Sequence, residues 1–279
     1  MPDPNIAASR PQIMGVVNVT PDSFSDGGSF LSSKKAVDQA LRLVDEGADI
    51  LDIGGESTRP GASPVPPSQE LDRVMPVIEA LAQRADAALS IDTRKPGVAR
   101  AAINAGAAIW NDVSALTFDG TSPAVAAELQ CELVLMHAQG DPKTMQIKPH
   151  YDDVVAEVAA FLRERANAAQ AAGVSKNRIM VDPGIGFGKT LPHNLALLAH
   201  LDAFTEIAPV LLGVSRKSFI AAIDREENGA NPTPDQRLGG SLAAILAARG
   251  AAVLRVHDVA ATRQAVAVFE AIETVRRSR

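Results

Sequence analysis

The chain has 279 residues and a formal net charge of −6, and 46% of its residues are hydrophobic and 22% charged. These proportions are ordinary for a globular protein, and they exclude long disordered, collagen-like or coiled-coil segments. Aromatic residues make up only 4% of the chain. The core must therefore be built from Ala, Val, Ile and Leu, as in sheets of buried parallel strands covered by helices.

The charge, the single cysteine and the N-terminal segment narrow the class of protein further. Nucleic-acid-binding proteins usually carry a basic stripe. Here no run of Lys and Arg is longer than a pair, such as Arg276 and Arg277, so we expect no nucleic-acid partner. Cys131 is the only cysteine, which excludes an internal disulfide and a cysteine metal cluster. The first ten residues lack the pattern of a secretory signal, and no apolar run approaches the ~20 residues of a membrane span. We therefore expect a soluble, cytoplasmic protein.

Short β-rich runs alternate with longer Ala-rich segments along the chain. The runs predict strands over residues 13–19, 50–53, 89–91, 108–110, 133–136, 179–181, 210–213 and 253–256. The segments between them predict helices over residues 34–46, 68–85, 96–105, 123–130, 152–172, 191–201, 234–249 and 259–275. Eight strand–helix units in this order favour a (β/α)8 TIM barrel of the α/β class over a doubly wound open sheet. No linker divides the chain, so we expect one domain over residues 1–279 with its core at 11–276.

Polar or charged residues follow every predicted strand. In a TIM barrel the carboxyl ends of all strands meet at one face, where the active sites of this fold lie. Each such residue can alternatively be a helix cap or a turn former. Eight strand ends of this kind in succession favour a functional face. Its polar residues include Asn18, Thr20, Asp22, Asp52, Glu56, Arg59, Asp92, Arg94, Asn111, Asp112, His137, Asp182, Ser215, Arg216, Lys217, Ser218, Arg255, His257 and Asp258.

The glycine-rich segment 182–190 resembles a phosphate-binding P-loop but fails its spacing. The first glycine of that motif would stand where Pro183 is found. What remains is a carboxylate, Asp182, at a strand end, followed by alternate glycines that let the backbone approach a flat ligand closely.

Arg59, Lys217, Arg255 and His257 form a cationic set on the same predicted face. Arg forks and Lys point charges bind phosphate well, although salt bridges to neighbouring carboxylates are the alternative. The histidines lack the H-E-x-x-H spacing of a zinc site. A phosphate ester could bring Mg²⁺ with it, and the amide oxygen of Asn18 could then supply one ligand. There is no G-x-S-x-G nucleophile motif, and we expect Cys131 to be structural.

The segments at the strand ends resemble the signatures of the dihydropteroate synthase family. Residues 14–28 read MGVVNVTPDSFSDGG and residues 52–61 read DIGGESTRPG. Shorter matches are SIDTR at 90–94, NDVS at 111–114, LMH at 135–137, DPGIGFGK at 182–189, GVSRKS at 213–218 and RVHDV at 255–259. The resemblance runs from about residue 11 to the last predicted helix.

This resemblance implies a (β/α)8 barrel, usually a homodimer, that works in folate synthesis. Members of the family join 6-hydroxymethyl-7,8-dihydropterin diphosphate to 4-aminobenzoate, release diphosphate and use Mg²⁺. Sulfonamide drugs, which mimic 4-aminobenzoate, target them. The partners implied are therefore small-molecule substrates and a second copy of the chain, with no membrane involved.

The resemblance also implies a role for each matched position. The catalytic residues would be Asp92, Lys217 and Arg255. The pterin would be bound by Asp92, Asn111, Met136, Asp182, Phe187, Gly213, Lys217 and Arg255. The diphosphate would be held by Asn18, Thr58, Arg255 and His257, and Asn18 would also be a ligand of Mg²⁺. The aminobenzoate site would be shaped by Phe24, Arg59, Pro60, Lys217 and Ser218.

The chemistry of these substrates predicts a dissociative substitution. Diphosphate is a good leaving group, and the pterin ring can delocalise the cation left behind, so no covalent enzyme intermediate and no dedicated base are expected. We expect the loops 20–30 and 57–67 to close over the reacting carbon. Two alternatives stay open. One is a pterin-binding methyltransferase, which would share Asp182 and Asn111 but needs no diphosphate site. The other is a catalytically silent paralogue.

Overall fold

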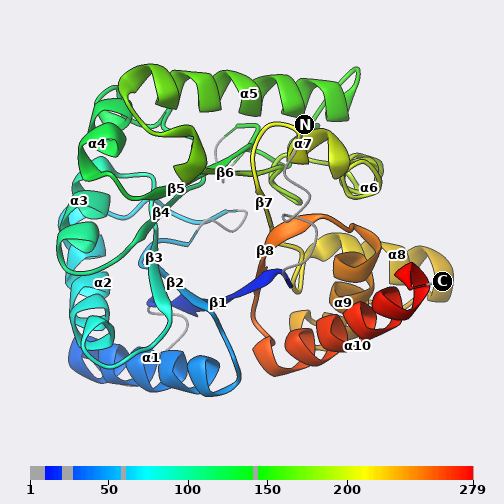
Figure 1. Cartoon of the computed structure of the whole chain (residues 1–279), viewed down its shortest axis with the longest axis horizontal. Helices are drawn as coiled ribbons and strands as arrows, with labels where there is room; N and C mark the ends of the chain where they lie inside the picture. The colour runs from blue at the N-terminus through cyan, green and yellow to red at the C-terminus, as the bar shows by residue number, and fades with distance from the viewer. Residues whose placement is uncertain (1–9, 21–27, 58–60, 141–143, 279) are drawn as a thin grey trace.

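The computed structural model describes residues 10–20, 28–57, 61–140 and 144–278. Eight parallel strands pair in sequence order, and the last closes on the first to complete a barrel (Figure 1). This confirms the expected (β/α)8 fold. The strands are β1 (Gln12–Asn18), β2 (Ile50–Gly54), β3 (Ala88–Asp92), β4 (Ile109–Asp112), β5 (Glu132–Met136), β6 (Ile179–Asp182), β7 (Val210–Leu212) and β8 (Ala251–Val256).

Helices surround the barrel, and their apolar faces pack on the outer side of the sheet in one large core. They are α1 (Gly28–Asp45), α2 (Pro67–Ala82), α3 (Pro96–Asn104), α4 (Ser122–Leu129), α5 (Val154–Ala172), α6 (Leu191–Ala199), α7 (Asp202–Thr205), α8 (Ser218–Asn228), α9 (Leu238–Ala247) and α10 (Val259–Arg277), with the short turns η3 (Lys176–Arg178) and η4 (Pro234–Arg237).

The segment after β7 differs from the prediction. A single helix was expected over residues 234–249, but α8 comes first, and the expected helix is divided into η4 and α9. Phe219 and Ile220 are buried on α8, and Gly229 ends it in the left-handed conformation with φ 67°. No helix or strand was predicted over residues 214–233. Helix α1 also begins earlier than predicted, at Gly28.

The interior of the barrel is layered, because side chains on a strand point alternately to opposite sides. One apolar cluster takes a side chain from most of the strands: Met14, Ile50, Ile109, Val134, Met180, Leu211 and Val253. Two residues further along the chain from these come Val16, Asp52, Asn111, Met136, Asp182, Gly213 and Arg255, of which four are polar or charged. The period of two therefore places a largely polar layer directly above an apolar one.

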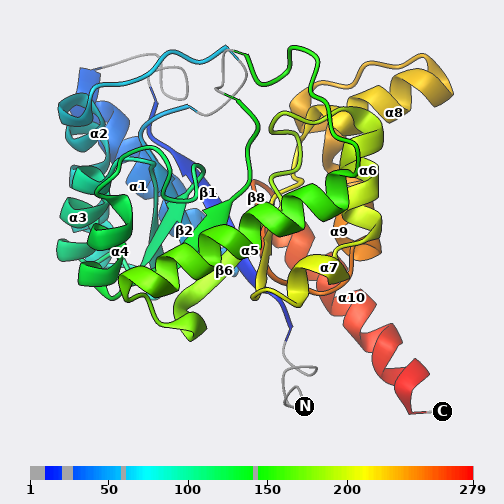
Figure 2. The same cartoon turned by 90° about the horizontal axis from the view of Figure 1, so that it is seen from above.

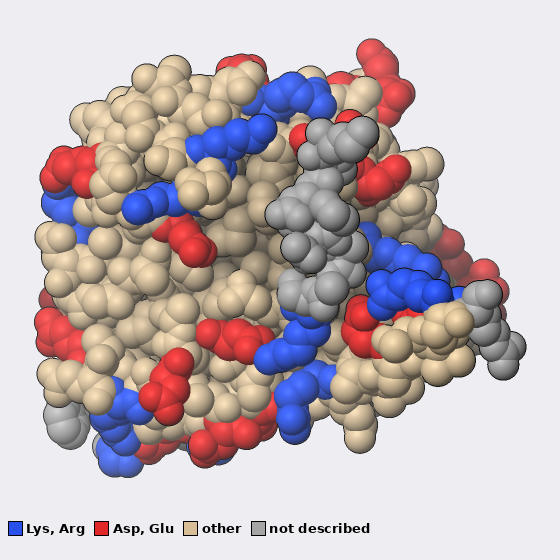
Figure 3. All heavy atoms as spheres, in the orientation of Figure 1, with Lys and Arg blue, Asp and Glu red and all other residues tan. Residues whose placement is uncertain are grey.

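The two ends of the described chain lie at one end of the barrel, and the strand-to-helix loops lie at the other (Figure 2). On the face shown in Figure 3, Lys and Arg side chains are interspersed with Asp and Glu, so charges of both signs alternate there. Within the described residues, no helix is long and apolar enough to cross a membrane.

The loop from β6 to α6 packs tightly against the end of β5. Gly184, Gly186 and Gly188 have φ values of 67°, 85° and 64°, which only glycine adopts readily. A Cβ atom on Gly184 would lie 1.9 Å from the backbone oxygen of His137, and one on Gly188 would lie 2.5 Å from the backbone oxygen of Gln139. The glycines thus let this loop lie directly on the backbone that follows β5.

We predict that Gly184→Ala lowers the free energy of unfolding by at least about 2 kcal/mol, because it combines backbone strain with overlap against a backbone atom. Gly97→Ala is the matched control, since a Cβ atom there meets nothing within 4 Å and the residue lies in α3. It should leave stability unchanged or raise it by up to about 1 kcal/mol. Urea unfolding followed by circular dichroism measures both. Equal stability of the two variants would contradict the prediction.

Candidate active site

The floor of the barrel at its carboxyl end is a buried network centred on Asp52. The guanidinium of Arg255 donates from Nε to Asp52 Oδ2 at 2.6 Å and from Nη2 to Asp92 Oδ2 at 2.8 Å. Asn111 Nδ2 donates to the same Asp52 oxygen at 3.1 Å, and Ser90 Oγ donates to Asp52 Oδ1 at 2.6 Å. The structure therefore brings the predicted residues Asp92, Asn111 and Arg255 together. Asp52, to which no role was assigned, links them.

Burial sets the charges in this floor. It raises the pKa of Asp92 to about 7, although Arg255 opposes the shift, and the carboxylate of Asp52 adds to it. Burial alone would lower the pKa of Arg255, but Asp52 and Asp92 hold it above its ordinary value. Arg255 is thus a permanent cation. In the structure Arg255 therefore forms salt bridges to carboxylates, which was the alternative interpretation of the cationic residues.

Asp182, Phe187 and Lys217 form one wall above the floor. Asp182 Oδ1 accepts a hydrogen bond from the backbone N–H of Gly184 at 2.7 Å, and burial raises the pKa of this carboxyl. Lys217 Nζ lies 4.1 Å from the centre of the Phe187 ring. Burial lowers the pKa of Lys217 to about 8, and Asp182 opposes the shift. The wall thus combines a buried carboxylate, an aromatic face and a cation.

A cavity of about 370 Å³ opens at this end of the barrel. Its lining includes Asp92, Arg94, Phe118, Met136, Phe161 and Phe187. Volumes of this order, with apolar walls and a few polar groups, are typical of small-molecule sites. Met136 and Phe187, which were expected to cover the faces of a flat ring, both line the cavity.

Lys189 and His137 form a buried pair that the sequence did not reveal. The ammonium of Lys189 lies 2.9 Å from His137 Nδ1 and donates to the backbone oxygen of Phe187 at 2.9 Å. Burial lowers the pKa of Lys189 to about 7, and burial together with Lys189 lowers the pKa of His137 to about 3. The neutral imidazole therefore accepts from Lys189. The pair connects the loop that carries Phe187 to the end of β5.

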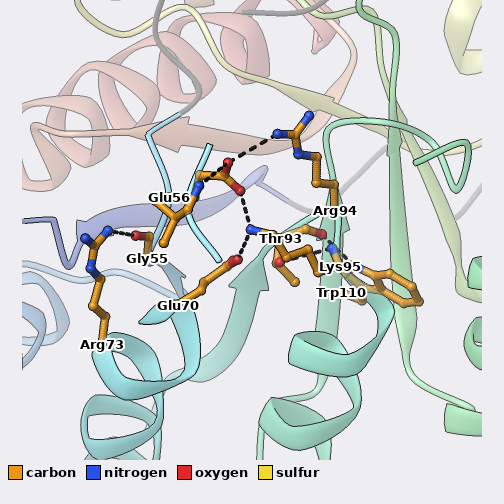
Figure 4. Close-up of polar contacts among 9 residues, drawn as sticks. Gly55, Glu56, Glu70, Arg73, Thr93, Arg94, Lys95 and Trp110 are labelled. Carbon is orange, nitrogen blue, oxygen red and sulfur yellow. Dashed lines mark hydrogen bonds and ion pairs between the residues drawn. The ribbon is translucent and has the colours of Figure 1, made fainter. Parts of the chain in front are cut away.

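The loop from β2 to α2 is anchored at both of its ends by Glu56 (Figure 4). The Glu56 carboxylate accepts from the Lys95 ammonium at 2.6 Å, from Arg94 Nη2 at 3.2 Å and from the backbone N–H of Val65 at 3.2 Å. Lys95 also pairs with Glu70, which is fully buried on α2. A single carboxylate therefore joins the start of the loop, its end and the residues that follow β3.

The remaining predicted residues lie around the mouth of the barrel or outside the described chain. Asn18 ends β1 and is half-buried, and Ser218 begins α8 and is exposed. His257 follows β8, and its Nδ1 lies 3.1 Å from Ser215 Oγ. Thr58, Arg59, Pro60, Phe24 and Asp22 lie outside the described residues, as do parts of both loops that were expected to close.

Two residues have structural roles: Asp112, for which this was the alternative interpretation, and Cys131, for which it was expected. Asp112 is buried and forms a turn, because its carboxylate accepts from the N–H and the hydroxyl of Ser114 and from the N–H of Leu116. Cys131 is buried, and burial raises the pKa of its thiol. A thiol of this kind is a poor nucleophile, which agrees with a structural role.

The donor set near the cavity limits how a metal could bind. Among the described residues, no group of three or more His, Cys, Asp or Glu side chains could hold an ion. Mg²⁺ commonly takes one or two protein oxygens and completes its shell with substrate phosphates and water. The amide of Asn18 at the rim fits that single-ligand mode, whereas a cage made only of protein ligands does not fit.

The comparisons with known proteins agree with this arrangement. The family of pterin binding enzymes matches residues 14–257. Dihydropteroate synthase from Escherichia coli strain K12 is 49% identical over 266 residues, which cover 94% of this chain and 92% of the relative. The chain belongs to the dihydropteroate synthase family.

Solved structures of dihydropteroate synthases support the assignment. The enzyme from Xanthomonas albilineans with 4-aminobenzoic acid has a TM-score of 0.88 and 53% identity, over 95% of this chain and 94% of that one. The enzyme from the same organism in complex with 7,8-dihydropteroate has a TM-score of 0.84 and 50% identity, over the same shares of the two chains. Dihydropteroate synthases are transferases of folate biosynthesis, so the predicted family, fold and reaction class are confirmed.

Proposed function

We propose that the carboxyl end of the barrel, where the described cavity opens, is where this chain joins 6-hydroxymethyl-7,8-dihydropterin diphosphate to 4-aminobenzoate, forming 7,8-dihydropteroate and diphosphate. One observation supports the assignment of this reaction to the site. Asp92, Asn111, Asp182, Lys217 and Arg255 come from separate strand ends, and all stand at the carboxyl end of one barrel. The dihydropteroate and 4-aminobenzoic acid bound by the relatives support the choice of substrates.

Residues of the floor and of the wall provide the groups that would recognise a pterin. A pterin carries a guanidine-like edge, and an ionised carboxylate can accept two parallel hydrogen bonds from it. Asp182 is the carboxylate for that edge, because it is buried at the end of β6 and interacts with Lys217, which lies over the Phe187 ring. Asn111 and Asp92 serve the other polar atoms of the ring, and Lys217 donates to a ring acceptor. Met136 and Phe187 cover the two faces.

The reaction needs little proton transfer from the protein. As the bond from carbon to the diphosphate oxygen breaks, the pterin ring delocalises the positive charge that develops on the carbon. The aniline nitrogen of 4-aminobenzoate is neutral near pH 7 and attacks that carbon, and the nitrogen then loses a proton to water or to the released diphosphate. Arg255 and His257 stabilise the negative charge that grows on the departing oxygens. The substitution is therefore dissociative, with no covalent intermediate on the enzyme.

Mg²⁺ belongs to this proposal as a cofactor. The amide oxygen of Asn18 would hold it together with the diphosphate, and Thr58 would add a contact to the diphosphate. The ion supplies charge neutralisation at the leaving group. Phe24, Arg59, Pro60 and Ser218 would shape the aminobenzoate side of the site, with Lys217 between the two substrates.

We also propose that the chain forms a homodimer through α10. Val268, Ile272 and Val275 on this helix are exposed to 57%, 49% and 57%, and their spacing places them on one face. A second copy would bury this stripe.

We also propose that the protein is cytoplasmic. Its single cysteine cannot form an internal disulfide, and proteins of the reducing cytoplasm rarely contain disulfides.

The reaction is tested by following diphosphate release from the pterin diphosphate. Release should require both 4-aminobenzoate and Mg²⁺, and dihydropteroate should accumulate in equal amount. Asp182→Asn should lower kcat/KM by about 100-fold or more, since it removes a charged acceptor from the pterin edge. Tight pterin binding without turnover would instead indicate a silent paralogue, and methyl transfer from methyltetrahydrofolate would indicate the methyltransferase alternative.

The pH dependence of kcat/KM for the pterin diphosphate should be bell-shaped. Asp182 must be ionised for both of its oxygens to accept from the pterin edge, and its raised pKa makes activity fall on the acid side. Lys217 must be protonated to donate as a cation, and its pKa of about 8 makes activity fall above that pH. Lys217→Arg keeps the charge, so its alkaline limb should move up by more than about one pH unit. An unmoved alkaline limb in this variant would assign the limb to another group.

The dimer is tested by light scattering during size-exclusion chromatography. Ile272→Glu places a charge in the exposed stripe and should shift the protein to monomer. Thr274→Glu, on another face of the same helix, should leave the mass unchanged. A monomeric parent protein at micromolar concentration would refute the proposed interface.

A further inference from the structure

Arg216 stands in an unusual conformation directly before Lys217. It lies in the turn between β7 and α8, and its φ of 61° is in the left-handed region that residues other than glycine rarely adopt. Such a conformation costs on the order of 1–3 kcal/mol and persists only where the surroundings hold it. The contacts of Arg216 show what holds it.

Both backbone polar atoms of Arg216 are bound by residues from the segment that follows α8. Its N–H donates to Ser241 Oγ at 3.0 Å, and its carbonyl oxygen accepts from Arg237 Nη1 at 3.0 Å. Ser241 is buried, and its hydroxyl donates in turn to the backbone oxygen of Arg237 at 2.8 Å. The left-handed turn is therefore fixed from two sides.

The side chain of Arg216 crosses to the turn that follows β8. Nε and Nη2 donate to the two carboxylate oxygens of Asp258 at 3.1 and 2.8 Å, which is the paired geometry that an Arg fork favours. On its outer side, Nη1 donates to Asp235 at 2.5 Å, but the Asp235 side chain is 80% exposed. The Asp258 side chain is 25% exposed and carries the better geometry.

A second contact lies beside this ion pair. Ser215 Oγ accepts from the backbone N–H of His257 at 3.2 Å and lies 3.1 Å from the Nδ1 atom of the same residue. Consecutive residues of the β7 turn, 215 and 216, therefore bond to consecutive residues of the β8 turn, 257 and 258. Lys217 continues the first turn, and His257 belongs to the second.

We propose that Arg216 is a positioning residue that, through Asp258, sets the separation between Lys217 and His257. The inference rests on the proposed function, in which Lys217 binds the pterin and His257 binds the diphosphate of the same substrate. A substrate held at both ends binds tightly only if the two sites are spaced to match it, because the second contact is then made at high effective concentration. The ion pair between the turns supplies that fixed spacing.

The test compares the whole substrate with its two halves. Calorimetry with Mg²⁺ present measures the affinity for the pterin diphosphate, for 6-hydroxymethyl-7,8-dihydropterin and for inorganic diphosphate. In Asp258→Asn, the affinity for the pterin diphosphate should fall about tenfold or more, as expected when a partner of a charged pair is removed. The affinity for each half should change by less than about threefold, because each binding group is retained.

Asp235→Asn is the matched control, since it removes the exposed partner of the same guanidinium. It should change none of the three affinities by more than about twofold. Arg216→Lys keeps the charge but loses the fork, and it should reproduce the effect of Asp258→Asn. The double variant should lose little more than either single one, because both changes break one contact.

Three results would overturn the positioning role. The first is an unchanged affinity of Asp258→Asn and Arg216→Lys for the pterin diphosphate. The second is an equal loss for the halves and the whole, which would indicate general damage to the site. The third is an effect of Asp235→Asn as large as that of Asp258→Asn. If the parent protein bound neither half, the proposed function itself would fail, and that outcome is distinct from all three.

Discussion

The guanidinium of Arg255 is half-buried beside two buried carboxylates, and the site depends on how these three charges are paired. Its two carboxylate partners come from β2 and β3, whereas Arg255 itself comes from β8. Asp52 is fully buried, so loss of the guanidinium would leave its charge uncompensated, at a cost of up to about 3–5 kcal/mol. The pairs thus join the last strand to the second and third across the closed barrel. The same pairs hold the carboxylates of Asp52 and Asp92 in the floor, where Asp52 also accepts hydrogen bonds from Asn111 and Ser90.

The position of this polar floor follows from the geometry of strands. Inward-facing side chains recur every second residue, so Ile50 and Asp52, or Met180 and Asp182, share one side of a strand. The lower residue of each pair packs in the apolar layer, and the upper one places its carboxylate in the layer above it. A shift of one residue in any strand would turn its polar group toward the helices. The core and the binding floor are therefore specified by the same pattern.

The sequence predicted the barrel and most of the floor because both depend on local signals. Alternating β-rich and Ala-rich segments indicate the fold, and polar residues at strand ends indicate the face. The role of Asp52 could not be predicted in this way, since its partner Arg255 is 203 positions away and meets it only when the barrel closes. Lys189 and His137 pair through a loop whose shape depends on three left-handed glycines. Helix α8 was not predicted, and only Phe219, Ile220 and Ala221 of its residues are buried. Thr58, Arg59, Pro60 and Phe24 stay predictions.

The apolar layer beneath the floor also governs how molecules pass through the protein. Packed side chains from Met14 to Val253 close the barrel from below, so the cavity has its entrance at the loop end. On the proposed assignment, the pterin half of dihydropteroate occupies the floor and its aminobenzoate half extends toward that entrance. Substrates and product then enter and leave through the same opening. On that assignment, bound 4-aminobenzoate would obstruct the entry of the pterin diphosphate, and bound dihydropteroate would block the next turnover by occupying the place of the incoming pterin.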